Sequence, residues 1–266
     1  MKCRAGCLPV VVLAFSVALA AQEQEFARVL RNGEQATLSV FGPRPVDLAA
    51  KKLVDEFGVA INVEDPVYMY RDDVQEVGVA RSGRGVLIPK ASLLEMRFDL
   101  SPVGSLLDVR EVVRDLVDTA NAQLPFAYRI DNDGDVFTLV ASRTRDEHGR
   151  SIELTPILDR HVTIPLGTRK ILEHVSLLTQ ALEQQTGVRV SCCQAAVGGI
   201  PWGSTVIPFE ARDEPARSAL LRLIQSEQGN PNHVAGVEPR RYHWLLRCQP
   251  AQSWCFVNVA PIPHKP

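Results

Sequence analysis

The sequence has no marked excess of either charge, and aromatic residues are scarce. Its 266 residues carry 29 basic and 31 acidic side chains, so the formal net charge is -2. Nucleic-acid binding is therefore not expected, because it usually requires clustered cationic residues. Only 6% of the residues are aromatic, but 45% are hydrophobic, which is enough for one or two ordinary cores and excludes a disordered or fibrous chain.

No apolar run is long enough to predict a membrane-spanning helix. The longest run, Leu8–Leu19, covers about a dozen residues, whereas a spanning helix needs roughly 20. Lys2 and Arg4 precede this run and small residues end it at Ala20, as in an export signal. We therefore predict that residues 1–20 are a signal peptide, cleaved near Ala20, and that no transmembrane segment remains after cleavage.

Cysteine is also scarce, and the expected cleavage removes two of the six. The remaining four, Cys192, Cys193, Cys248 and Cys255, are an even number in an exported protein, which favours disulfides. Cys248 and Cys255 flank the segment QPAQSW, so a bridge closing a hairpin there is the first expectation. Cys192 and Cys193 would then form a strained vicinal pair or stay thiols, and crossed pairing with the hairpin remains open.

Motifs for catalysis, metals and cofactors do not occur. The six histidines are scattered without a His-Glu-x-x-His pair, and no serine lies in a Gly-x-Ser-x-Gly elbow. The adjacent cysteines lack the spacer of a zinc knuckle, and the acidic segment Asp131–Asp135 fits a hairpin turn better than a calcium loop. We expect no metal, no cofactor and no catalytic residue, although a hydrolase-like site assembled from distant residues stays open.

An internal repeat organises the rest of the chain. Residues 46–57 carry one apolar helix face, followed by Gly58 and the extended segment VAINV, which predicts a helix and then a strand. Residues 171–190 repeat this plan, with Gly187 at the corresponding end of the helix. A strand is expected before each helix, at 36–41 and at 161–165.

The second unit of each half follows the same plan. A strand at 95–100 precedes a helix with apolar residues from Val109 to Ala120. STVIPFEA precedes a helix for which Asp213-Glu214-Pro215 is the expected cap and first turn, and each half ends in a predicted hairpin. The sequence therefore predicts an α+β fold of two similar βαβ-βαβ halves, each with two helices packed on small sheets.

The predicted domain boundaries follow from this repeat. The first domain spans 21–144, a charged and Gly-containing linker spans 145–153, and the second domain spans 154–266. With under 130 residues in each half, two small domains fit the length. Whether the halves share one core stays open.

The second half resembles the short N-terminal (STN) domain shared by secretins and TonB-dependent receptors. The resemblance rests on Val162-Thr163-Ile164-Pro165, on LLTQALEQQTGVRVSC and on VIPFEARDEPARSALLRLIQSEQG. The first half, with RPVDLAAKKLVDEFGVAINVED and MRFDLSPVGSLLDVREVVRDLVDTANAQ, looks like a more diverged copy. The segment TIPLGTRKILEH departs from the family pattern by lengthening the loop or the start of the helix.

The resemblance implies a periplasmic, non-enzymatic module that binds another envelope protein, such as a secretin or an outer-membrane receptor. It implies no catalytic residue. No receptor barrel or ring-forming region follows in the sequence, so the regulated pore is expected to be another chain. The open alternatives are a periplasmic enzyme and a small-molecule or glycan receptor with a pocket near Trp202.

Three aromatic residues are candidate contacts for a partner. Trp202 lies in a Gly-rich loop that offers it little cover, and aromatic anchors dominate the energetics of interfaces. Tyr68 and Tyr70 alternate on one face of an irregular or edge strand, where they contact a partner or cover the helix pair. Unpaired sheet edges offer a more general means of binding, because a partner strand pairs with them without any sequence motif.

Overall fold

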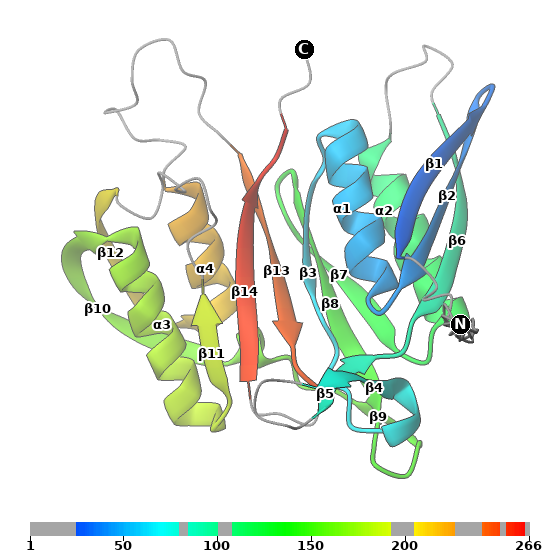
Figure 1. The fold of residues 1–266 in the computed structure, drawn as a ribbon. Coiled ribbons are helices and arrows are strands. Elements are labelled where there is room, and N and C mark those ends of the chain that lie inside the picture. Colours follow the sequence, from blue (N-terminus) through cyan, green and yellow to red (C-terminus); the bar gives the residue numbers. More distant parts are fainter. Residues whose placement is uncertain are drawn as a thin grey trace, which may run out of the picture.

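The computed structural model describes residues 25–79, 85–100, 108–192, 205–226, 241–250 and 254–263. The expected α+β class is confirmed (Figure 1). The first half contains the helices α1 (Pro45–Phe57) and α2 (Val109–Gln123) and the 3-10 turn η1 (Arg71–Asp73). Its strands are β1 (Phe26–Asn32), β2 (Gln35–Gly42), β3 (Ala60–Glu64), β4 (Val74–Val79), β5 (Gly85–Pro89), β6 (Ser92–Asp99), β7 (Ala127–Asp133) and β8 (Val136–Arg145).

The second half follows a short connection that holds β9 (Ser151–Glu153) and η2 (Ile157–Asp159). Its helices are α3 (Ile171–Thr186) and α4 (Ala216–Gln225), and its strands are β10 (His161–Lys170), β11 (Arg189–Cys192), β12 (Val206–Pro215), β13 (Tyr242–Cys248) and β14 (Trp254–Pro261). The predicted linker at 145–153 is therefore partly ordered into the sheet, because β9 pairs with the end of β8. None of the helices in these described ranges is long and apolar enough to cross a membrane.

Strand pairing follows the same order in the two halves. In the first half β3 runs parallel to β8, β8 runs antiparallel to β7, and β2 pairs with β6. In the second half β11 runs parallel to β14, β14 runs antiparallel to β13, and β10 pairs with β12. α1 and α3 end at Gly58 and Gly187, whose φ of 67° and 69° lies in the left-handed region that favours glycine. The element order agrees with the predicted repeat, and the duplication itself stays a prediction.

One mixed sheet joins the halves, which the sequence did not predict. β3 pairs in parallel with β13, with Val63 opposite Leu245, so the strand order is β11-β14-β13-β3-β8-β7. Leu245 packs in the core of the first half, and its neighbour Leu246 packs in the core of the second half. Because successive side chains of a strand point to opposite faces, α1 and α2 cover one face of this sheet and α3 and α4 cover the other (Figure 1).

The predicted cap of α4 is wrong. β12 continues through Asp213 to Pro215, and α4 begins at Ala216 without a side-chain cap. Asp213 instead has a φ of 48°, and its backbone N–H donates to the Thr163 hydroxyl at 3.3 Å. The pairing of β12 with β10 thus determines where the helix starts, because His161 pairs directly opposite Pro215.

Candidate functional site

The seam between the halves brings buried polar groups together. The backbone N–H of Trp244 in β13 donates to Asn62 Oδ1 in β3 at 2.9 Å, and Asp65 N–H donates to the Leu246 carbonyl at 2.8 Å. His243 Nδ1 donates to the Ile61 carbonyl at 3.2 Å. Side chains and backbone together therefore pair these buried backbone groups where the two strands meet.

Arg217 is the central cation of this seam. It is the second residue of α4, and its Nε lies against the Glu64 carboxylate at the end of β3. Its Nη1 is 2.8 Å from Asp131 Oδ2 in β7 and 2.6 Å from Asp159 Oδ1 in η2. Arg129 joins the same two aspartates, at 3.1 Å from Asp131 and 3.0 Å from Asp159. The Arg217 guanidinium thus contacts carboxylates from three elements, β3, β7 and η2.

Burial governs the electrostatics of this cluster. Glu64 is 1% exposed, and burial raises its pKa, while the hydrogen bond and charge of Arg217 oppose that rise. Burial lowers the pKa of Arg217, but the hydrogen bond and charge of Glu64 outweigh it, so the net shift is upward. The cluster has three carboxylates for two guanidinium groups. A buried pair of this kind depends on both partners, because a lone buried charge is costly.

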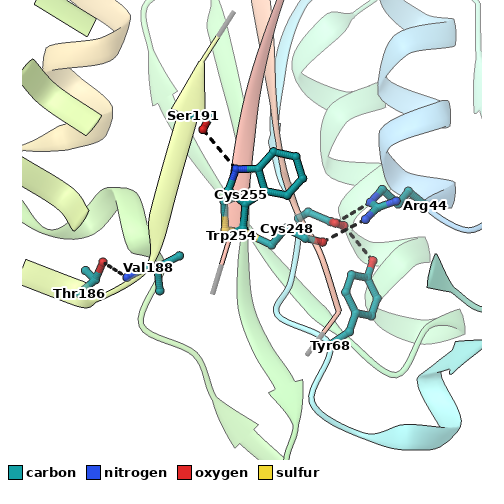
Figure 2. The surroundings of a disulfide bond; sticks show 9 residues. Arg44, Tyr68, Thr186, Val188, Ser191, Cys248, Trp254 and Cys255 are labelled. Atoms are coloured by element: carbon teal, nitrogen blue, oxygen red, sulfur yellow. Dashed lines mark hydrogen bonds and ion pairs between the residues drawn. A yellow bond between two sulfur atoms is a disulfide. The ribbon is translucent and has the colours of Figure 1, made fainter. Parts of the chain in front are cut away.

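A second cluster lies at the same end of β3. Asp65 Oδ2 accepts a hydrogen bond from Arg44 Nε at 2.6 Å, and its Oδ1 accepts one from the Tyr68 hydroxyl at 2.8 Å. Arg44 Nη2 also donates to the Cys248 carbonyl at 3.0 Å, so the residue before α1 anchors the end of β13 (Figure 2). Burial raises the pKa of Asp65 to about 6, although Arg44 opposes the shift.

Stability should fall as the pH rises from about 4 to about 6, through the titration of Asp65. Its ordinary pKa is 3.8 and its folded pKa is about 6, so the folded chain holds the proton more tightly than the unfolded chain. The contribution is therefore complete below about pH 4 and is lost above about pH 6. Urea unfolding at several pH values should show this slope in the wild type and a smaller slope in Asp65→Asn. An identical slope in the two proteins would contradict the assignment.

The β13–β14 hairpin carries the expected disulfide. Cys248 and Cys255 face each other in the register of the two strands and are bridged, so this pairing is confirmed and crossed pairing is wrong. Both cysteines are buried. Beyond this hairpin, the indole Nε1 of Trp254 donates to the Ser191 hydroxyl of β11 at 3.2 Å (Figure 2). Cys192 is also disulfide-bonded, and Cys193 lies outside the described residues.

A cavity of about 330 Å³ lies beside the seam. Its walls come from the two halves and from the connection between them, and they include Leu154, Val188 and both bridged cysteines. Glu64 and Asp65 also line it, and Glu64 Oε2 has no hydrogen-bond partner among the described residues. The volume lies near the lower end of the range for small-molecule sites, which combine apolar walls with a few polar groups.

The aromatic candidates do not gather at one surface. Tyr68 is only 4% exposed, packs edge to face on Phe126 and donates its hydroxyl to Asp65, so it covers the core and presents no free face to a partner. Tyr70 is half-buried, beneath the Arg145 guanidinium at 4.8 Å from the ring centre, and donates to Asp72. Trp202 lies outside the described residues.

Neither Arg217 nor Glu64 was among the functional residues predicted from the sequence. The only sequence signal was weak: Glu64 follows an apolar strand directly, and Arg217 sits among apolar residues of a helix. Asp131, interpreted as part of a turn, instead reaches Arg217, whereas Gly134 and Asp135 do form the hairpin turn. Comparisons with protein-family models, with curated proteins and with solved structures find no match to this chain.

Proposed function

We propose that the chain is an exported, non-enzymatic binding module of the bacterial cell envelope. In this role it acts in the periplasm and engages a secretin, a TonB-dependent receptor or another envelope protein. The observation that carries the proposal is the shared order of elements and pairings in the two halves, the plan that the STN-like sequence motifs predict. A scaffold of repeated α+β units offers several sheet edges, which bind partner strands through backbone hydrogen bonds.

The disulfide supports the proposed compartment. Disulfides form and persist in exported proteins and are rare in reducing compartments. The Cys248–Cys255 bridge lies at the end of β13 that also receives Arg44, so it stabilises the joint between the halves. An oxidising periplasm would keep this disulfide intact.

Affinity capture with cross-linking tests the proposal. The mature chain, tagged at its C-terminus, is incubated with envelope extract, cross-linked and analysed by mass spectrometry. We expect one secretin, receptor or other envelope protein to be enriched, and enrichment to be lost when excess untagged chain competes. Recovery of the same proteins by the urea-unfolded chain would mean nonspecific capture and would contradict the proposal.

A small-molecule receptor is the second candidate, and the seam cavity favours it. The cavity combines apolar walls with a buried carboxylate oxygen of Glu64 that lacks a partner in the described residues. A ligand with an apolar body and a hydrogen-bond donor fits that chemistry. Mass spectrometry of small molecules released from the purified, unfolded chain discriminates the two functions. A stoichiometric organic ligand would favour the receptor.

A further inference from the structure

The two halves differ at the outer edge of their small sheets. In the first half β2 has a neighbour on each side, β6 and β1, and the sheet has three strands. In the second half β10 occupies the place of β2 and β12 the place of β6, judged by their pairing and by the helices that follow them. Within the described residues β10 pairs with β12 alone, and Figure 1 shows it at the outer left of the molecule.

β1 shows how such an edge is covered. It pairs antiparallel with β2 over its whole length, from Phe26 opposite Phe41 to Asn32 opposite Gln35. Its alternate residues Ala27 and Val29 pack against the core of the first half. Glu25, just before the strand, lies beside Gly42 at the end of β2. The edge thus accepts a segment with small apolar residues at every second position.

Among the described residues, no strand pairs with the outer edge of β10. Ile171 N–H donates to the Thr205 carbonyl at 2.9 Å, and Arg169 pairs opposite Ile207. Because the backbone groups of an antiparallel strand alternate in direction, Thr168 and Lys170 turn theirs away from β12. Pro208 lies opposite Thr168 and has no N–H to donate. This agrees with the alternation, because a residue opposite Thr168 needs no hydrogen bond to β10.

Exposed apolar side chains accompany this edge. Leu166 in β10 is 67% exposed, Val206 in β12 is 57% exposed and Leu172 in the first turn of α3 is 40% exposed. Scattered exposed apolar residues need no explanation, but these three lie on adjoining elements. Covering them would bury apolar surface at the position that corresponds to β1.

We propose that the open edge of β10 binds an extended segment of a partner protein, antiparallel to β10, in the place that β1 occupies on β2. The segment carries small apolar residues at alternate positions and an acidic residue at its start. In the first half, Glu25 precedes β1 and lies beside the end of β2. The corresponding end of β10 is Lys170, so an acidic residue at the start of the partner segment would lie beside a lysine. This inference rests on the proposed binding function and names its site.

A peptide copied from the β1 segment of this chain serves as the probe for binding at β10. A fluorescent peptide of residues 25–32, EFARVLRN, has the required pattern and already fits an edge of this type. We expect fluorescence anisotropy to show saturable binding to the mature chain. Thr168→Pro should weaken binding at least tenfold, because proline removes the outward N–H, whereas the matched variant Thr168→Val keeps the N–H and should bind as the wild type does.

A charge exchange tests the same site independently, so the proposal stays testable if Thr168→Pro does not fold. Lys170→Glu should weaken binding of EFARVLRN a few-fold, and a peptide with lysine in place of Glu25 should restore it, since a partly exposed ion pair has a modest effect. The proposal is overturned if the peptide does not saturate, or if neither Thr168→Pro nor the charge exchange changes its affinity. The peptide assay uses only purified protein, whereas the capture experiment uses envelope extract. A negative peptide result would therefore overturn the binding site on β10 without contradicting the proposed function.

Discussion

Replacing Arg217 by methionine is expected to lower the free energy of unfolding by about 3–5 kcal/mol. Methionine keeps much of the aliphatic stem but removes the charge that faces Glu64, Asp131 and Asp159. The Glu64 side chain is only 2% exposed, so water cannot replace the guanidinium. The two aspartates are 36% and 29% exposed and are partly solvated, so most of the loss comes from Glu64.

Urea unfolding with linear extrapolation measures this loss. The matched control is Arg212→Met, which removes an ion pair to Glu210 whose arginine side chain is 80% exposed, and it should cost less than about 1 kcal/mol. The double variant Arg217→Met with Glu64→Gln should recover part of the loss, because no uncompensated buried charge remains. A loss in Arg217→Met as small as in Arg212→Met would contradict a central role for Arg217 in the seam.

The elements with strong local signals were predicted from the sequence. α1 and α3 have one apolar face each and end at Gly58 and Gly187, and periodicity with a left-handed glycine is a local property of the chain. The β13–β14 disulfide was also predicted, since a hairpin brings its own flanking cysteines into register. Binding at Tyr70 and Trp202 stays a prediction.

The seam could not be predicted in this way, because it depends on contacts between distant segments. Arg217 and Glu64 are 153 residues apart, and no periodicity relates them. One signal was nevertheless present: five of the seven residues in the β13 segment YHWLLRC are apolar, which is typical of a strand covered on both faces. The helices that cover those faces come from different halves, and β13 joins the halves in one mixed sheet.

In the part of the chain that the structure describes, the second half has no counterpart of β1, and the sequence did not predict this difference. β1 contains three polar residues in seven, Arg28, Arg31 and Asn32, and gives only a weak strand signal. The structure holds it by pairing with β2 and by the Arg31 guanidinium over the Phe57 ring, at 5.5 Å from its centre. The difference between the halves therefore emerged only from their strand pairing.

Removing the Cys248–Cys255 bridge is expected to lower the free energy of unfolding by about 2.5 kcal/mol. The bridge closes a short loop, with a sequence separation of seven, and the entropy of the open loop in the unfolded chain gives a loss of that order. Both cysteines are buried in the core of the second half, so alanine is the least disruptive replacement. The measurement is urea unfolding of Cys248→Ala/Cys255→Ala without reductant.

The two single variants are the matched controls, because either one breaks the same bridge. Each should lose nearly as much stability as the double variant, whereas additive losses would mean that packing of the sulfur atoms, not the cross-link, dominates. The loss should also reach the seam, since Arg44 holds the Cys248 carbonyl at the end of β13. Hydrogen exchange at the amides of Asp65 and Leu246 should therefore accelerate in the double variant, while exchange in α2, which is remote from the hairpin, should change only by the global loss.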